Sequence, residues 1–370
     1  MEQRIIQGRG SLNTQKLAAL MQKLAMERPL LVCGRRMQAE FAARTGFSLP
    51  WFDGYHPNPD LADCIAGAEM YRKNGCDSLI SLGGGSAMDS AKGIKALLLA
   101  GDLDAVRVSQ LPESVSLPHI AIPGTAGTGA EATPIAVVYE HNEKLSLDHP
   151  ALLPEGVVLD VSLLVTLPLY HKKACAMDAL CQGIESWWAV KATTESRVHA
   201  ARAIRGVMGG MKAYLAGDAA AAETVLEAAY ESGCAIRISR TTAAHAMSYQ
   251  ITKRIGPAHG HACMLTLPHL WRRMGETTVL TELAEIIGAA PENVPELLLG
   301  MLAALDMLPE TAPDADLLDA LVASVNVQRL GNHPQTLTAD ALREIYVQAL
   351  TPVGRVEAER LATLWRSYAG

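Results

Sequence analysis

Apolar and polar positions follow different patterns in the two halves of this chain. In the first half, short apolar runs typical of buried strands alternate with longer amphipathic stretches typical of helices. We predict helices at 60–73 and from about 85 to 100, and strands at 29–34, 76–82, 119–122, 135–139 and 157–160. This alternation predicts a mostly parallel α/β sheet covered by helices.

The second half has almost no strand-like runs and consists of long Ala- and Leu-rich amphipathic segments. We predict helices at 170–190, 194–215, 219–249, 276–288, 293–305, 315–328 and 338–349, with a further helix beginning near 258. The fold class is therefore a Rossmann-like α/β domain at 1–165 followed by an all-helical domain at 166–370.

Composition narrows the functional classes. A net charge of −7 without any basic run argues against nucleic acid as a partner. No apolar stretch is long enough to cross a membrane, and the opening residues lack a secretory apolar core. Seven scattered cysteines with no CxxC pair suit a reducing compartment, so we expect a cytoplasmic protein.

Three consecutive glycines, Gly83, Gly84 and Gly85, lie between a predicted strand and a predicted helix. Without side chains they let the backbone approach a ligand closely, and the helix N-terminus suits a phosphate. We expect Ser86 to cap this helix. The pattern predicts a nucleotide pyrophosphate site, although a tight turn that needs positive φ would also explain the glycines.

Polar residues at helical spacing in the second half form a candidate metal site. Asp178 and Gln182 are four residues apart and share a helix face, while His245 and His259 lie on later elements. Imidazole nitrogen with carboxylate and amide oxygen suits Zn²⁺ or Fe²⁺. Taken singly, each residue could equally be a polar stripe, a buried histidine or a cap.

The order and spacing of these residues resemble the iron-containing (group III) alcohol dehydrogenases over nearly the whole chain. The resemblance rests on the segments 83–92 and 122–131, on Pro57-Asn58-Pro59, and on the metal segments, with His259 fourteen residues after His245. It implies a divalent metal held by Asp178, Gln182, His245 and His259. It also implies a nicotinamide cofactor contacted by Gly83, Gly84, Gly85, Ser86, Asp89, Thr125, Thr128 and Lys144.

The reaction that the resemblance implies is hydride transfer between the nicotinamide and a small aldehyde or alcohol, with the metal as a Lewis acid. This chain departs from the family at two positions that usually hold histidines. Gln182 can ligate only through its carbonyl oxygen, so we expect a weaker site. Tyr249 is a candidate proton donor, and His261 is a second candidate catalytic residue.

The end of the first predicted strand bears on the choice of cofactor. Relatives that use NAD carry an acidic residue there, whereas this chain has Gly34 followed by Arg35 and Arg36. Gly34 leaves room for a 2′-phosphate, and an arginine can pair with it. We therefore expect NADPH, with NADH as the alternative.

The segments around the metal residues are similar to a phosphonate-metabolism branch of the family, which includes phosphonoacetaldehyde reductases. Lys253, Arg254 and His261 lie near the two metal histidines in sequence and are candidates for binding a phosphonate group. The two cations could instead stabilise a helix C-terminus. We expect a small-molecule substrate and a homodimer or larger homo-oligomer.

Other functions on the same fold stay open. A polyol dehydrogenase of the glycerol type would be NAD-linked and zinc-dependent. A lyase of the dehydroquinate synthase type would need a glutamate as first ligand, where this chain has Asp178. A nucleotide-binding sensor that has lost its metal would explain Gln182 without any catalysis.

Overall fold

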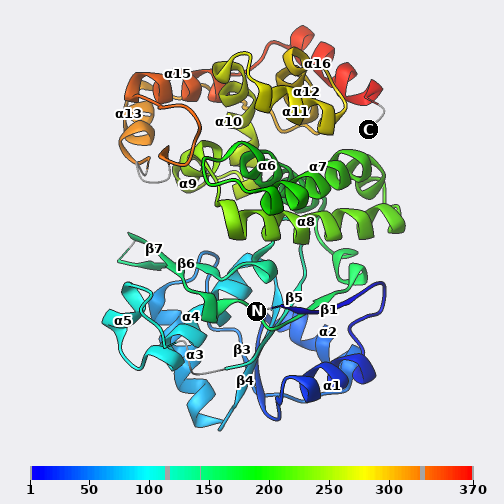
Figure 1. Ribbon diagram of the computed structural model, residues 1–370, viewed down its shortest axis with the longest axis vertical. Helices are drawn as coiled ribbons and strands as arrows, with labels where there is room; N and C mark the ends of the chain where they lie inside the picture. Colours follow the sequence, from blue (N-terminus) through cyan, green and yellow to red (C-terminus); the bar gives the residue numbers. More distant parts are fainter. Residues whose placement is uncertain (1, 113–116, 142, 326–329, 369–370) are drawn as a thin grey trace. The chain divides into compact units, whose positions relative to one another are not determined.

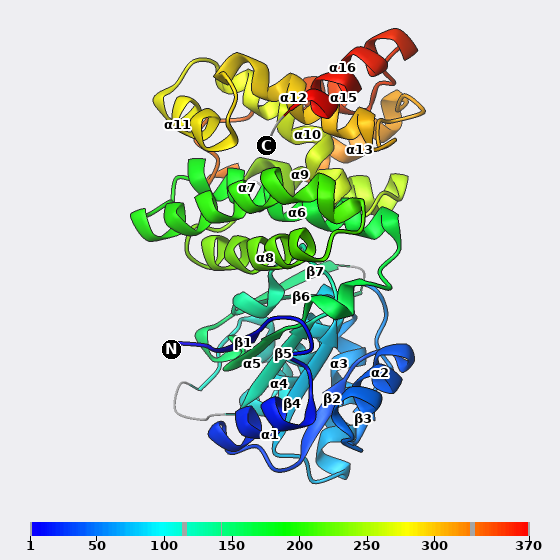
Figure 2. The same ribbon diagram turned by 90° about the vertical axis from the view of Figure 1, so that its right-hand side faces the viewer.

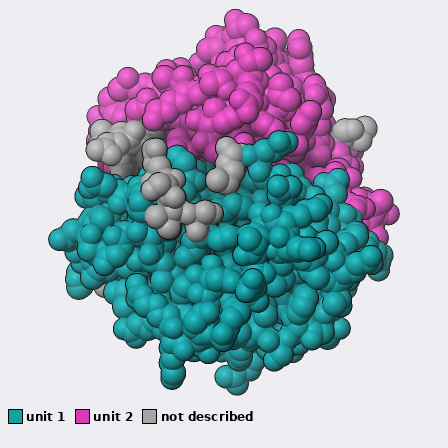
Figure 3. All heavy atoms as spheres, turned by 60° about the horizontal axis from the view of Figure 1, so that its bottom comes forward, with its two compact units in different colours: residues 1–167 teal, residues 168–370 magenta. Residues whose placement is uncertain are grey.

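The computed structural model describes residues 2–112, 117–141, 143–325 and 330–368. The chain divides into two compact units, Met1–Leu167 and Pro168–Gly370, which Figure 3 colours separately. Among the described residues, no helix has both the length and the apolar character needed to cross a membrane.

The first unit contains a six-stranded sheet whose neighbouring strands are all parallel. In sequence order the strands are β1 (Arg4–Gln7), β2 (Pro29–Val32), β3 (Trp51–Phe52), β4 (Ser78–Gly83), β5 (His119–Pro123) and β8 (Gly156–Leu159). Their order across the sheet is β1-β8-β5-β4-β2-β3. Buried apolar side chains line both faces of the central strands, which explains their continuous apolar runs.

Helices α1 (Thr14–Lys23), α2 (Arg35–Thr45), α3 (Leu61–Lys73) and α4 (Gly85–Ala100) cover the two faces of this sheet, and α5 (Leu103–Arg107) packs against α4. Alternate residues of each strand enter different cores because side chains alternate along a strand. Leu30 and Leu79 pack with α3, α4 and α5, whereas Leu31 and Ile80 pack with α1 and α2. The layers are visible in Figure 2.

The segment predicted as a strand at 135–139 does not join the parallel sheet. Instead β6 (Ile135–Glu140) pairs antiparallel with β7 (Glu143–Asp148) in a separate two-stranded sheet. Its burial alternates, with Ala136 and Val138 fully buried and Ile135, Val137 and Tyr139 only partly buried. One covered face is typical of an antiparallel hairpin, but the apolar run Ile135–Tyr139 shows no such alternation in the sequence, so it resembled a buried strand of the parallel sheet.

The second unit is helical throughout its described residues, as the sequence predicts (Figure 1). Its helices are α6 (Leu169–Trp188), α7 (Thr194–Leu215), α8 (Ala219–Ser239), α9 (Ala243–Ile255), α10 (His259–Met274), α11 (Thr278–Ile287), α12 (Val294–Ala304), α13 (Ala315–Ala323), α15 (Ala339–Leu350) and α16 (Arg355–Ser367). The last residues of the helix predicted at 315–328, from 326 on, lie outside the described residues.

The predicted helix at 219–249 is wrong as one element, because the chain breaks it into α8 and α9. Arg240 has a φ of +63°, which ends α8. The backbone then turns, and Thr242 becomes the residue before α9. This break sets the direction of α9, which carries His245. The sequence analysis also did not predict α16.

Candidate nucleotide site and metal centre

The predicted nucleotide site lies at the carboxyl edge of the six-stranded sheet. β2 and β4 are neighbours in the sheet. The strand that follows β2 in sequence, β3, lies on one side of this pair, and the strand that follows β4, β5, lies on the other side. Open α/β sheets bind ligands beyond the strand ends where the strand order reverses in this way. Gly34 follows β2 and Gly83 ends β4, so both residues lie at this reversal.

The glycine turn after β4 depends on its glycines for backbone shape and for space. Gly83 has a φ of +151°. A Cβ on Gly84 would lie 3.3 Å from the Cγ2 atom of Thr125, and one on Gly85 would lie 3.3 Å from the Cγ2 atom of Thr128. The two threonines predicted to contact the cofactor therefore pack directly against the turn. The turn leads into α4, whose first N–H groups have no acceptor within the helix.

Ser86 does not cap α4, so this prediction was wrong. The residue before the helix is Gly84, and no side chain accepts a hydrogen bond there. Ser86 lies inside the first turn, where its Oγ accepts a hydrogen bond from the backbone N–H of Asn58 at 3.2 Å. Because no hydroxyl caps the helix, its first amides stay available to an anionic ligand.

Asp89 and Lys144, also predicted at the cofactor, lie where α4 packs on the β6–β7 hairpin. The carboxylate of Asp89 accepts a hydrogen bond from the backbone N–H of Val137. Burial raises the pKa of Asp89 to about 6, and the charges of Lys92 and Lys144 act against this rise. These contacts give both predicted residues a role in packing within the first unit.

Lys92 anchors the segment that follows the Thr125–Thr128 loop. Its buried ammonium donates to the carbonyl oxygens of Ala130 and Ile135, each at 2.7 Å. Burial lowers the pKa of Lys92 to about 8. The lysine thereby ties α4 to the loop that covers the glycine turn.

Gly34 is the residue just before α2, and the space that a side chain would occupy there is open. No atom lies within 4 Å of the position that a Cβ would take. Arg35 is exposed, whereas Arg36 donates hydrogen bonds to the carbonyl and hydroxyl oxygens of Thr166. Of the two arginines, Arg35 is therefore the more available for a ligand at this strand end.

In the second unit, three predicted metal ligands meet in one buried cluster. Donor atoms of Asp178 on α6, His245 on α9, and His259 and Cys263 on α10 all lie within 4.8 Å of one another. Asp178 and His245 are 2% and 4% exposed. The cluster therefore combines a carboxylate, two imidazoles and a thiol, of which only His259 is partly exposed.

Glu185 fixes the orientation of His245. Its Oε2 forms a hydrogen bond with Nδ1 of His245, and its Oε1 accepts from the backbone N–H of Ala244 at 2.8 Å and the hydroxyl of Thr242 at 2.7 Å. One carboxylate thus caps the start of α9 and holds a proton on Nδ1 of the histidine. The other ring nitrogen, Nε2, then faces the cluster.

His259 is oriented by Ser248 and Tyr249. The Oγ of Ser248 donates to the carbonyl of His245 at 2.9 Å, so it can accept the Nδ1 proton of His259 at 3.2 Å. The ring of Tyr249 stacks on that of His259, with centroids 5.5 Å apart and planes 21° apart. Nε2 of His259 therefore also turns toward the cluster.

The inward-facing atoms of the cluster suit a divalent cation. Asp178 Oδ1 and His245 Nε2 are buried without a hydrogen-bond partner and lie 3.3 Å apart. Burial alone would raise the pKa of Asp178, but contact with His245 and the charge of His259 lower it, which keeps the carboxylate ionised. Two atoms bound to one ion at 2.0–2.2 Å in tetrahedral geometry lie roughly 3.3–3.6 Å apart.

Gln182 reaches the same cluster, but its oxygen is engaged elsewhere. The Oε1 of Gln182 accepts a hydrogen bond from the hydroxyl of Ser232 at 2.7 Å. The side chain also forms a hydrogen bond with the carboxylate of Asp178. The amide therefore bridges α8 to Asp178.

Gly260 allows α10 to approach α6 at the cluster. A Cβ at this position would lie 2.1 Å from the carbonyl oxygen of Ala174 and 2.5 Å from the Cβ of Asp178. Only glycine fits between the two helices at this point. The close approach places His259 beside Asp178.

Three predicted residues do not join the cluster. His261 forms hydrogen bonds with the hydroxyl of Tyr170 at 3.2 Å and with the carbonyl of Met307 at 2.7 Å, so both of its ring nitrogens are engaged away from the metal ligands. Lys253 and Arg254 are exposed in the last turn of α9, where cations favour the helix end. Arg254 is further held by Gln250 at 3.0 Å.

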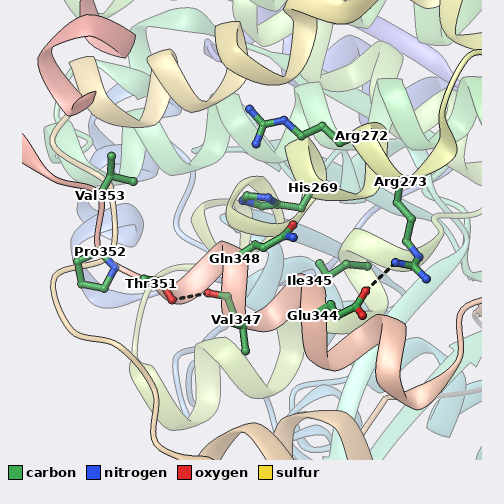
Figure 4. Close-up of a pocket in the computed structure, with 10 residues that line it drawn as sticks. All are labelled: His269, Arg272, Arg273, Glu344, Ile345, Val347, Gln348, Thr351, Pro352 and Val353. Carbon is green, nitrogen blue, oxygen red and sulfur yellow. Dashed lines mark hydrogen bonds and ion pairs between the residues drawn. The ribbon is translucent and has the colours of Figure 1, made fainter. Parts of the chain in front are cut away.

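A surface pocket of about 730 Å³ in the second unit lies between α10, α15 and the segment after α15 (Figure 4). Its lining includes His269 and Arg272. It also includes Arg273 and Glu344, which form an ion pair with 2.9 Å between a guanidinium nitrogen and a carboxylate oxygen. It contains none of the predicted site residues. The chemistry of the cluster therefore gives a better guide to the site than pocket size does.

Glu185, Ser248 and Cys263 were not predicted from the sequence. Each lies at a helical spacing from a residue that was predicted. Glu185 follows Asp178 by seven positions, Ser248 follows His245 by three, and Cys263 follows His259 by four. Such spacings return to the same helix face. A search of the same faces for further polar residues would have found all three.

Comparison with known proteins bears on both units. The family model for iron-containing alcohol dehydrogenases matches residues 2–161, and the model for the C-terminal part of the Fe-containing alcohol dehydrogenase family matches residues 173–349. Phosphonoacetaldehyde reductase from Streptomyces viridochromogenes is 34% identical over 315 residues, which cover 78% of this chain and 80% of the relative.

Solved structures show the same fold. Sulfoacetaldehyde reductase from Bifidobacterium kashiwanohense, in complex with NAD⁺, is 25% identical with a TM-score of 0.84, over 94% of this chain and 97% of the other. An iron-containing alcohol dehydrogenase from Thermotoga maritima is 26% identical with a TM-score of 0.83, over 95% of this chain and 98% of the other. The predicted fold class, a parallel α/β unit followed by a helical unit, is confirmed.

Proposed function

The chain belongs to the iron-containing alcohol dehydrogenase family, and from that premise we propose that it is a metal-dependent reductase of small aldehydes. Its second unit would bind the metal and its first unit the nicotinamide cofactor. The observation that carries this proposal is the pair of partnerless buried atoms, Asp178 Oδ1 and His245 Nε2, which face each other in the cluster.

Asp178, His245 and His259 are the residues that would hold the metal. When bound, the ion would polarise the carbonyl group of the aldehyde, and the nicotinamide would supply the hydride. Glu185 holds a proton on Nδ1 of His245 and so keeps Nε2 free to ligate. Tyr249, stacked on His259, is our candidate for donating a proton to the developing alkoxide. His261 has no part in this proposal because both of its nitrogens are engaged elsewhere.

The first unit would bind the cofactor at the carboxyl ends of β2 and β4. Backbone N–H groups of Gly84, Gly85 and Ser86 at the start of α4 would contact the pyrophosphate. We propose NADPH as the preferred form, because the open space at Gly34 admits a 2′-phosphate and the exposed Arg35 can pair with it. NAD(H) is the form supported by the relative that was solved with NAD⁺.

We propose an aldehyde bearing an anionic group as the substrate, with phosphonoacetaldehyde first. The support is the 34% identical phosphonoacetaldehyde reductase together with the structurally similar sulfoacetaldehyde reductase. Lys253 and Arg254 remain the candidate partners for the anionic group. Either Fe²⁺ or Zn²⁺ fits the donor atoms.

Two further proposals concern the protein in the cell. A cytoplasmic location is supported by seven cysteines that form no disulfide in the described part of the chain. A homodimer or larger homo-oligomer is the expected assembly, which sedimentation velocity would measure.

A substrate panel tests the proposed function. Metal-loaded protein would be assayed for oxidation of NADPH and of NADH with phosphonoacetaldehyde, sulfoacetaldehyde and propanal, and a His259→Ala variant would serve as control. We expect a higher kcat/KM for the anionic aldehydes than for propanal and no turnover by the variant. Equal rates on all three aldehydes would leave a general aldehyde reductase, and oxidation of glycerol with NAD⁺ alone would indicate a polyol dehydrogenase.

A further inference from the structure

Cys263 belongs to the cluster with Asp178, His245 and His259, although it is not one of the predicted metal ligands. It lies one helical turn after His259 on α10 and is fully buried. Its Sγ atom is 3.8 Å from Nε2 of His259, and it lies within 4.8 Å of the donor atoms of Asp178 and His245. Three helices thus bring four metal-binding side chains together.

The separations within this cluster agree with a single tetrahedral ion. An ion with a nitrogen ligand at about 2.0–2.1 Å and a sulfur ligand at about 2.3 Å would separate those two atoms by roughly 3.5 Å. The observed distance from Sγ to Nε2 of His259 is 3.8 Å, and the observed distance from Asp178 Oδ1 to Nε2 of His245 is 3.3 Å. All four donor atoms lie within 4.8 Å of one another, so they can close around one ion.

Gln182 is less well placed to be the fourth donor. Only its Oε1 could ligate, and that atom accepts the hydrogen bond of Ser232 at 2.7 Å. The same side chain is hydrogen-bonded to Asp178. To ligate through oxygen, Gln182 would have to give up the hydroxyl of Ser232.

We propose that the thiolate of Cys263, and not the amide oxygen of Gln182, is the fourth protein ligand of the metal. Gln182 is then a positioning residue that holds the carboxylate of Asp178. This inference rests on the proposed function, because it specifies the metal centre on which that function depends.

The charge of the centre follows from this ligand set. The carboxylate of Asp178 and the thiolate of Cys263 together balance the two positive charges of a divalent ion, and both histidines are neutral. Because thiolate is a soft donor, this ligand set favours Zn²⁺ over Fe²⁺.

Cobalt substitution of the full-length protein tests the assignment through a spectrum. A thiolate bound to Co²⁺ produces a charge-transfer band in the near ultraviolet, which nitrogen and oxygen ligands do not produce. We expect this band in the wild type, its loss in Cys263→Ser, and Co²⁺ binding in that variant weaker by at least the roughly 10- to 100-fold that loss of an outer-shell partner causes. Cys263→Ala gives the same readout if a buried serine hydroxyl prevents folding.

Two control variants separate the alternatives. Gln182→Ala should keep the charge-transfer band, and so should Cys181→Ser, which removes another fully buried cysteine. Bound Co²⁺ without the band in the wild type, or a band that survives in Cys263→Ser, would overturn the assignment and leave the proposed function intact. If the wild type bound no Co²⁺ at all, both the assignment and the metal-dependent function would fall.

Discussion

Single residues in the second unit control which ring nitrogens His245 and His259 present to the cluster. Glu185 and Ser248 each contact an Nδ1 atom, so that both Nε2 atoms turn inward. A buried carboxylate can hold such a proton only if it stays ionised. Burial raises the pKa of Glu185, but the charge and hydrogen bond of His245 outweigh this effect and lower it. The orientation of the site thus depends on residues that do not themselves ligate.

Replacing Glu185 with Gln tests this orientation. The amide would keep the shape of the side chain but lose the charge, so we expect metal affinity to fall roughly 10- to 100-fold. Glu195→Gln on the exposed surface of α7 is the matched control. The measurement is competitive titration of the metal against a chelator, and an unchanged affinity would contradict a role for Glu185 in holding His245.

At the first unit, Gly34 offers a direct test of cofactor choice. Gly34→Asp places a carboxylate in open space, so the fold should tolerate it. Repulsion of a 2′-phosphate should lower the preference for NADPH over NADH by about 1–3 kcal/mol. The ratio of the two kcat/KM values measures the shift, and Gly34→Ala separates charge from bulk. A ratio unchanged by the carboxylate would place the 2′-phosphate elsewhere.

At the scale of elements, the packing of α10 on α6 makes the metal cluster possible. Gly260→Ala would force the helices apart, because its Cβ would lie 2.1 Å from the carbonyl oxygen of Ala174. We expect a loss of about 1–3 kcal/mol in unfolding free energy, together with weaker metal binding. Gly209→Ala in α7, which has no atom within 4 Å of its Cβ, should instead be neutral or stabilising. Urea unfolding compares the two variants, and equal stability would refute the steric argument.

The loop beside the glycine turn carries a pH-dependent contribution to stability. Burial raises the pKa of Glu131 from 4.5 to about 7. Because the folded protein holds this proton more tightly than the unfolded chain does, the stabilisation is present below pH 4.5 and is lost as the pH rises through 7. Glu131→Gln should remove this loss. The unfolding free energy of the variant minus that of the wild type should be larger at pH 8 than at pH 4.5, on the order of 1–3 kcal/mol.

The control for this pH dependence is Glu143→Gln, which changes an exposed carboxylate in β7. Its unfolding free energy should follow that of the wild type across the same range. If Glu131→Gln also showed the wild-type dependence on pH, the carboxyl group of Glu131 would not be the source of the effect.

Local sequence patterns predicted the strands that are buried on both faces. They failed where residues distant in sequence determine the local structure. Fully buried strands such as β2 and β8 are visible as continuous apolar runs. The break between α8 and α9 is not, because Glu185, some sixty residues away, supplies the oxygen that caps α9. Similarly, Ser86 has the chemistry of a cap, but the glycine before the helix takes the cap position.

The candidate site shows the same division. Asp178, His245 and His259 could be selected by spacing, and the structure brings them together. His261 shares a helix with His259, but its ring is turned toward Tyr170 and Met307 by hydrogen bonds that no sequence spacing reveals. Spacing along a helix predicts a shared face, whereas the partner of that face is a property of the fold.

At the scale of the whole molecule, the chain divides its chemistry between two units. The first contains the glycine turn at the reversal of strand order, and the second contains the metal cluster. We propose that the cluster in the second unit binds one divalent ion on which catalysis depends. A protein that only binds nucleotides would need the glycine turn of the first unit but not the cluster of the second unit.

Stepwise reconstitution of metal-stripped protein tests this claim most directly. Fe²⁺ or Zn²⁺ would be added in increments, and oxidation of NADPH and of NADH by phosphonoacetaldehyde would be followed at each step. We predict no turnover without metal, a rise that saturates near one ion per chain, and no rise in His245→Ala. Full turnover by stripped protein in excess chelator, or a metal response that survives in His245→Ala, would contradict the account.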